Sequence, residues 1–85
     1  MKYYLYILES ATANKYYVGI SNDPNRRLTF HNSIETGFTS RYRPWELVFT
    51  KAFATKIEAL SAERKIKRWK NKVMTKRVIT GEIQL

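Results

Sequence analysis

The chain of 85 residues has no cysteine, a single histidine (His31), two prolines and three glycines. Without cysteine, disulfide bonds, thiolate zinc sites and cysteine nucleophiles are excluded. One histidine also excludes a histidine-rich metal site. No stretch approaches the roughly 18 apolar residues of a membrane-spanning helix, and the first residues lack the pattern of a secretory signal. We therefore expect a cytoplasmic protein that does not contact a membrane.

Acidic residues are also scarce. Seven Asp and Glu stand against 16 Lys and Arg, which gives a net charge of +9. The imbalance is concentrated in the second half, because residues 1–40 carry +1 and residues 41–85 carry +8. A basic half on a small domain indicates a polyanionic partner, most often nucleic acid. The alternative is a charge that serves only solubility.

The remaining composition predicts one folded domain. Hydrophobic residues make up 44% of the chain, which is enough to build a core. A chain of this length has room for one domain, so we expect residues 1–85 to form a single unit.

Side-chain patterns predict three strands and three helices. β-branched and aromatic residues mark strands at 3–8, 15–20 and 45–53. The short connection between the first two strands favours an antiparallel hairpin. Helices are expected at 24–32, 55–70 and 72–80, with residues 33–44 as an exposed loop. The predicted fold is therefore α+β, a small three-stranded antiparallel sheet flanked by helices in the order β-β-α-β-α-α.

Helix starts have specific signals in this chain. Asp23 can cap the first helix, and Pro24 suits the first helical position because its missing N–H is not needed there. Thr55 and Glu58 have the spacing of a capping box at the start of the second helix.

Alternation along the first two strands predicts that two tyrosines lie together. The aliphatic residues expected to face the core are Leu5, Ile7, Val18 and Ile20. Tyr6 and Tyr17 then point together to the opposite face. Gly19, beside Tyr17, leaves a gap of the kind that marks close approach by another group. The simpler interpretation is an exposed aromatic pair that stabilises the hairpin.

The first predicted helix presents Arg27 and His31 on one face, since they are four residues apart. Arginine suits a phosphate because its planar fork can donate two hydrogen bonds. Histidine can exchange a proton near neutral pH. An ordinary solvated helix face is the alternative.

The long helix contains one carboxylate in an unusual place. Its apolar stripe is expected to contain Ala59, Ala62, Ile66, Trp69 and Val73. Glu63 lies at the border of this stripe, where a carboxylate must be paired, reach outward or bind a cation. A hard-cation ligand and a salt bridge to a nearby Lys or Arg are both open. One lone carboxylate indicates at most a single divalent ion, with water in its other positions.

Taken together, these segments resemble the GIY-YIG nuclease domain, specifically its small stand-alone bacterial members of the UPF0213 type. Tyr4-Leu5-Tyr6 resembles the first motif of the family, and Tyr17-Val18-Gly19 resembles the second. Residues 23–32 resemble the arginine helix of the family, and residues 58–69 resemble its metal-site helix. No single motif is specific, but the ordered set is, and it covers nearly the whole chain.

The resemblance implies roles for individual residues. Tyr6 and Tyr17 would be the active-site tyrosines, and either could take a proton from the attacking water. Arg27 would hold the phosphate, and His31 stands where the family has His or Tyr. Glu63 would bind one Mg²⁺ or Mn²⁺. Asn71 is the nearest counterpart of a polar residue that the family often has beyond the metal-site helix.

The function implied is a metal-dependent endonuclease that hydrolyses DNA phosphodiester bonds, in DNA repair or processing, without a small-molecule cofactor. Two departures from the family pattern favour an alternative. Tyr4 replaces a glycine of the first motif, and Ile20 stands where a basic residue often follows the second.

The alternative is a nucleic-acid-binding module that cleaves weakly or not at all. The basic residues expected to contact phosphates are Arg41, Arg43, Lys67 and Lys70, with Gly19 and Asn71 near the bound strand. A third hypothesis, a small protein that docks on an acidic partner, leaves the Tyr–Arg–Glu set unexplained.

Overall fold

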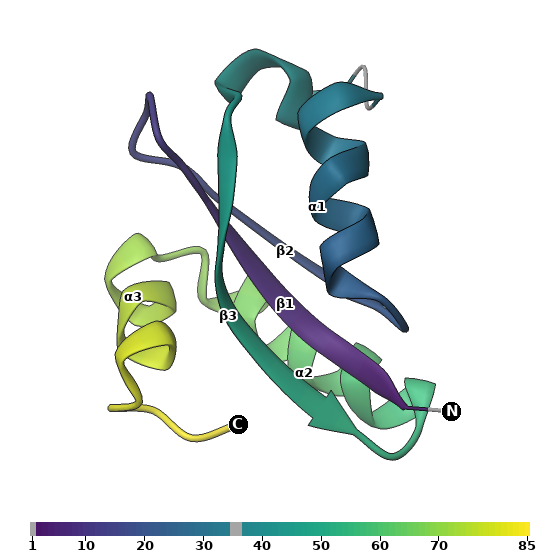
Figure 1. The fold of residues 1–85 in the computed structure, drawn as a ribbon. Coiled ribbons are helices and arrows are strands. Elements are labelled where there is room, and N and C mark those ends of the chain that lie inside the picture. Colours follow the sequence, from purple (N-terminus) through teal and green to yellow (C-terminus); the bar gives the residue numbers. More distant parts are fainter. Residues whose placement is uncertain (1, 35–36) are drawn as a thin grey trace.

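The computed structural model describes residues 2–34 and 37–85. The elements follow one another as β1 (Tyr3–Ser10), β2 (Tyr16–Ser21), α1 (Pro24–Ser33), the 3-10 helix η1 (Phe38–Tyr42), β3 (Trp45–Phe53), α2 (Lys56–Trp69) and α3 (Lys72–Thr80). The strands form one antiparallel sheet in the order β2-β1-β3 (Figure 1). The predicted α+β architecture is therefore confirmed.

The boundaries differ from the prediction at two places. β1 continues through Glu9 and Ser10, because as the central strand it pairs there with Tyr16 on one side and with Glu46 and Trp45 on the other. Pairing with two neighbours extends a strand over polar residues that have no intrinsic preference for it.

The segment predicted as an exposed loop contains η1. Within it, Thr39 is only 1% exposed, and its carbonyl accepts a hydrogen bond from the Trp45 indole at 2.7 Å. Residues 35 and 36 of the same predicted loop lie outside the described residues.

The predicted helix starts are confirmed. The Asp23 side chain accepts a hydrogen bond from the Arg26 backbone N–H at 3.2 Å. The Thr55 hydroxyl accepts one from the Glu58 N–H, also at 3.2 Å. The Glu58 carboxylate does not follow the usual capping-box pattern, since it accepts its bond from the Thr55 hydroxyl at 3.0 Å.

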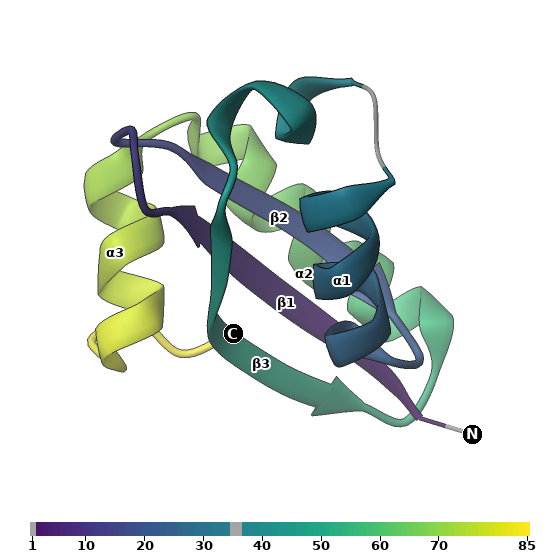
Figure 2. The same ribbon diagram turned by 45° about the horizontal axis from the view of Figure 1, so that its top comes forward.

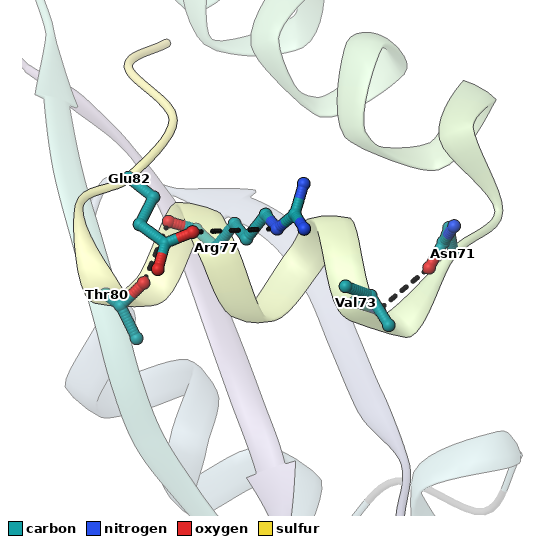
Figure 3. Close-up of polar contacts among 5 residues, drawn as sticks. All are labelled: Asn71, Val73, Arg77, Thr80 and Glu82. Carbon is teal, nitrogen blue, oxygen red and sulfur yellow. Dashed lines mark hydrogen bonds and ion pairs between the residues drawn. The ribbon is translucent and has the colours of Figure 1, made fainter.

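α2 and α3 are separated by Lys70, which adopts a left-handed conformation with φ of 47°. Asn71 then begins α3, and its side chain accepts a hydrogen bond from the Val73 N–H at 2.8 Å (Figure 3). Because the chain turns here, Val73 does not continue the apolar stripe of α2. It is 57% exposed, which corrects the prediction, whereas Ala59, Ala62 and Ile66 are buried as expected.

The other end of α3 is held by short-range polar contacts (Figure 3). The Thr80 hydroxyl donates to the Arg77 carbonyl at 3.2 Å, and the Arg77 guanidinium pairs with Glu82 at 3.5 Å. Both partners of this ion pair are more than half exposed, so the pair contributes little to stability.

The sheet separates two hydrophobic clusters, with α1 over one face and α2 behind the other (Figures 1 and 2). The cluster on the α2 side consists of the buried residues Leu5, Ile7, Val18, Ala62, Ile66 and Val78. The cluster on the α1 side has Tyr6, Leu8 and Trp45 at its centre. The predicted alternation is right, but Tyr6 does not belong to an exposed pair. It is 1% exposed, because α1 and η1 lie over this face.

None of the helices in the described ranges, 2–34 and 37–85, combines the length and the apolar character that crossing a bilayer requires.

Asn32, near the end of α1, joins this helix to the start of β3. Its side-chain amide donates to the Trp45 carbonyl at 3.0 Å and accepts from the Trp45 N–H at 2.6 Å. One side chain thus occupies both backbone groups of a residue that is 2% exposed. This contact fixes α1 and η1 over the sheet.

We expect Asn32→Ala to lower the free energy of unfolding by about 1–3 kcal/mol, because two hydrogen bonds to largely buried backbone are lost at once. Urea unfolding followed by tryptophan fluorescence measures the change. Asn14→Ala, at an exposed position between β1 and β2, is the control and should stay close to wild type. Equal stability of the two variants would show that the amide of Asn32 contributes nothing to the fold.

Candidate active site

A buried phenol and a buried imidazole meet between β1 and α1. The Tyr6 hydroxyl lies 3.0 Å from Nε2 of His31, and each residue is 1% exposed. Nδ1 of His31 lies 3.1 Å from the Thr39 hydroxyl. Both ring nitrogens therefore have a partner, which fixes the orientation of the imidazole. Sequence reasoning missed Thr39, since a threonine in a predicted loop gives no signal of this contact.

Tyr17 completes an aromatic group at this place. Its ring centroid lies 4.5 Å from that of His31 and 6.2 Å from that of Tyr6. Tyr17 is partly exposed, unlike the other two. The structure therefore brings together the two tyrosines and the histidine that sequence analysis selected, with Tyr17 as the more accessible phenol.

Gly19 pairs directly with Tyr6 across the two strands. A Cβ atom at Gly19 would lie 2.7 Å from the Tyr6 hydroxyl oxygen and 2.8 Å from Cζ of the same ring. Contacts this short do not occur in proteins, so only glycine leaves room for the phenol here. The gap expected beside Tyr17 is real, and it is filled by the Tyr6 ring.

Arg27 and Glu63 both influence Tyr6 electrostatically. Burial is the main effect, and it raises the pKa of the Tyr6 phenol above its ordinary value. A hydrogen bond with Arg27 and the charge of its guanidinium lower this pKa, while Tyr17 and the charge of Glu63 raise it. The guanidinium of Arg27 also lies over the Phe30 ring, with 4.4 Å between its carbon and the ring centroid. The four other candidate residues, His31 by its hydrogen bond and Arg27, Tyr17 and Glu63 by their effect on its pKa, therefore all act at the Tyr6 phenol.

Glu63 lies on the other side of the sheet, and its link to this group is the effect of its charge on the pKa of Tyr6. It projects from α2, which packs on β1 and on the edge strand β2, and its side chain is 17% exposed. Oε2 of Glu63 lies 3.4 Å from the Lys67 ammonium one turn further along the helix. The salt bridge expected as an alternative is therefore present. Since Lys67 is 57% exposed, such a pair is worth only a few tenths of a kcal/mol (about 0.3–0.5).

The donor set fits a single divalent ion. Across residues 2–34 and 37–85, His, Asp and Glu residues nowhere gather in a group of three that could enclose a metal. Mg²⁺ commonly binds through one or two carboxylates, with waters and substrate phosphates as its other ligands. Glu63 offers that one carboxylate, and the weak pair with Lys67 can be displaced.

The two arginines of the η1 region differ in their surroundings. Nε of Arg43 donates a hydrogen bond to the His31 carbonyl at 2.7 Å, so this side chain helps to hold η1 against α1. Arg41 is exposed on η1. Neither is among the residues that shift the pKa of Tyr6.

The remaining predicted contacts lie at the end of α2. Lys67 is paired with Glu63, and Lys70 is exposed at the turn into α3. Asn71 uses its amide oxygen to cap α3. Asn71 therefore has a structural role in addition to the contact with nucleic acid that the sequence suggested.

The two departures from the family pattern lie outside the phenol group. Tyr4 lines a separate hollow of about 340 Å³ near the start of α1. Ile20 packs against the hydrophobic cluster on the α2 side of the sheet, away from Tyr6 and Tyr17. Neither residue is positioned to obstruct the phenols.

Comparison with known proteins gives consistent matches. Residues 2–77 match the family model of the GIY-YIG catalytic domain. The chain is 43% identical over 70 residues to a UPF0213 protein of Streptococcus pneumoniae, and the aligned region covers 81% of this chain and 70% of that protein. It is 44% identical over 64 residues to the structure-specific endonuclease subunit slx1 of Schizosaccharomyces japonicus, covering 71% of this chain and 23% of that protein.

A solved structure shares the fold. The solution NMR structure of a UPF0213 protein from Bacillus halodurans matches with a TM-score of 0.60 and 29% identity, over 94% of this chain and 84% of that one. The sequence resemblance is thereby confirmed, and the chain belongs to the GIY-YIG catalytic domain family of nucleases.

Proposed function

We propose that this protein is a divalent-metal-dependent endonuclease that hydrolyses DNA phosphodiester bonds in DNA repair or processing. The observation that carries the proposal is the Tyr6 phenol, which is hydrogen-bonded to His31 and subject to the charges of Arg27 and Glu63. A net charge of +9 favours a polyanionic substrate. This substrate agrees with the cytoplasmic location that the sequence predicts.

Arg27 is the residue that we expect to hold the phosphate. Its guanidinium can donate two parallel hydrogen bonds to phosphate oxygens, and it opposes the extra negative charge of the transition state. Its position over the Phe30 ring restricts its motion, so less side-chain entropy is lost when a phosphate binds.

We assign the Tyr6–His31 pair as the proton acceptor. Because burial raises the pKa of Tyr6, a free phenolate is disfavoured near neutral pH. Transfer through the pair avoids that species: as the phenol oxygen takes a proton from the attacking water, the phenol proton passes to Nε2 of His31. This requires a neutral imidazole whose one ring proton is on Nδ1, where it donates to the Thr39 hydroxyl and leaves Nε2 as an acceptor.

Tyr17 and Glu63 then have separate roles. Tyr17 is the more exposed phenol, and we expect it to contact the substrate near the cleaved bond. Glu63 would hold one Mg²⁺ or Mn²⁺ through a carboxylate oxygen. When bound, such an ion neutralises charge that develops on the leaving oxygen.

The first test is nicking of supercoiled and branched DNA in Mg²⁺ or Mn²⁺. We expect Tyr6→Phe and Glu63→Gln each to lower the cleavage rate by about 10²-fold or more, since one loses the proton acceptor and the other a metal ligand. Tyr3→Phe, on the face of β1 opposite Tyr6, and Glu58→Gln, at the exposed start of α2, are matched controls that should stay near wild type.

If wild type cuts no faster than Glu63→Gln, the protein is not a metal-dependent nuclease. DNA binding that persists in that case would favour the alternative of a binding module without cleavage.

The second test concerns the fit between Gly19 and Tyr6. We expect Gly19→Ala to lower the free energy of unfolding by about 1–3 kcal/mol and to slow cleavage, because the new methyl group displaces the phenol. Both of the closest atoms, the Tyr6 hydroxyl oxygen and Cζ, belong to one phenol ring, so Gly19→Ala should cost less stability when Tyr6 is already Leu, which removes that ring.

A double-mutant cycle by urea unfolding measures this coupling. Additive effects of the two substitutions would mean that the methyl group does not meet the phenol.

A further inference from the structure

A second surface lies where the start of β2 meets the turn between α2 and α3. A hollow of about 250 Å³ there is lined by Lys67, Lys70 and Lys72, with Tyr16 and Asn71 among the other lining residues. All nine lining residues fall within the described chain, and none of them is acidic. The hollow is therefore a strongly positive concave surface outside the phenol group.

This hollow continues into another one along α3. The second hollow, of about 280 Å³, shares Tyr16 and Lys72 with the first and adds Lys76. Its single acidic residue is Glu9, which pairs with Tyr16 across β1 and β2. We call Lys67, Lys70, Lys72 and Lys76 the lysine track. Lys72 and Lys76 are one helical turn apart, so their charges follow one another along the same face of α3.

Three of these ammonium groups are available to a ligand. Lys70, Lys72 and Lys76 are exposed, and no ion pair involves them in the part of the chain that the structure describes. Lys15 also lines the first hollow, but its ammonium lies over the Tyr42 ring, 5.7 Å from the centroid. We therefore leave Lys15 out of the track.

The track begins beside the candidate active site. Lys67 is its first member and lies 3.4 Å from the Glu63 carboxylate. Val18, which also lines the first hollow, is the neighbour of Tyr17 on β2. A polyanion whose cleaved phosphate lies near the ion that Glu63 would hold can thus continue across the edge of β2 onto the track.

We propose that the lysine track binds the sugar-phosphate backbone of the DNA that extends beyond the cleaved phosphate. The proposal rests on the proposed function, because that function places the cleaved phosphate between Arg27 and the ion that Glu63 would hold. A row of charges along two adjoining hollows suits an extended polyanion better than a small anion, which would occupy one point only.

The test is a triple variant, Lys70→Gly, Lys72→Ala and Lys76→Ala. Glycine is chosen at position 70 because the left-handed backbone there favours it, so the charge is removed without added strain. The control variant carries Lys2→Ala, Lys56→Ala and Lys65→Ala, three exposed positions that line neither hollow. Both variants lose the same net charge, and thermal unfolding by circular dichroism checks that both are folded.

Binding to a fluorescent DNA duplex is measured by anisotropy in EDTA, so that cleavage does not interfere. Each lost phosphate contact lowers the slope of log affinity against log salt by about 0.9. We expect the slope for the track variant to be smaller than that of wild type by about 2–3, while the control variant keeps the wild-type slope. Equal slopes for the two variants would overturn the proposal.

Nicking of the same DNA in Mg²⁺ separates this proposal from the proposed function. If wild type does not cut but only the track variant shows the smaller salt slope, the track is supported and the nuclease function is wrong. If wild type cuts and both variants share one slope, the function is supported and the track is wrong. If wild type binds no DNA at low salt, both are wrong.

Discussion

The hydrogen bond between Tyr6 and His31 is the interaction on which the α1 side of the molecule depends. It joins the central strand to α1 across 25 residues of sequence, and both partners are almost fully buried. Buried polar groups are costly unless each has a partner. Thr39 supplies the second partner of the imidazole, so η1 must lie against α1 for the network to be complete. No buried side-chain nitrogen or oxygen within 2–34 and 37–85 lacks a hydrogen bond.

The two faces of the sheet are packed in different ways. The α2 side is an aliphatic core of the ordinary kind, built around Leu5, Ile7 and Ile66. The α1 side buries a phenol, an indole and an imidazole, each held by a specific polar contact. An aliphatic core tolerates substitutions that preserve volume, whereas a buried polar network loses stability when any member is removed. The α1 face is therefore the less tolerant one.

Local signals in the sequence predicted most of the architecture. The strands, the Asp23 and Thr55 helix starts and the facing of Tyr6 and Tyr17 all follow from residue preference and alternation, which act over short distances. The burial of Tyr6 could not be predicted in this way. It depends on α1 and η1 folding over the sheet, a long-range contact that alternation does not encode.

Two further features could not be predicted from local sequence patterns, for the same reason. Thr39 becomes a partner of His31 only because η1 returns to α1, and the loop composition around it favours exposure. Val73 fits the helical stripe of α2 by spacing, but the turn at Lys70 ends that helix first. A lysine does not indicate a left-handed turn, since glycine is the usual residue at such positions.

The left-handed backbone at Lys70 lowers the stability of the folded chain. A residue with a Cβ atom in this conformation costs about 1 kcal/mol or more relative to glycine. Evolution commonly accepts such a loss where a side chain serves a purpose that the fold itself does not need. At the junction of α2 and α3, a lysine in place of a glycine therefore adds a positive charge to the surface and lowers the stability of the fold.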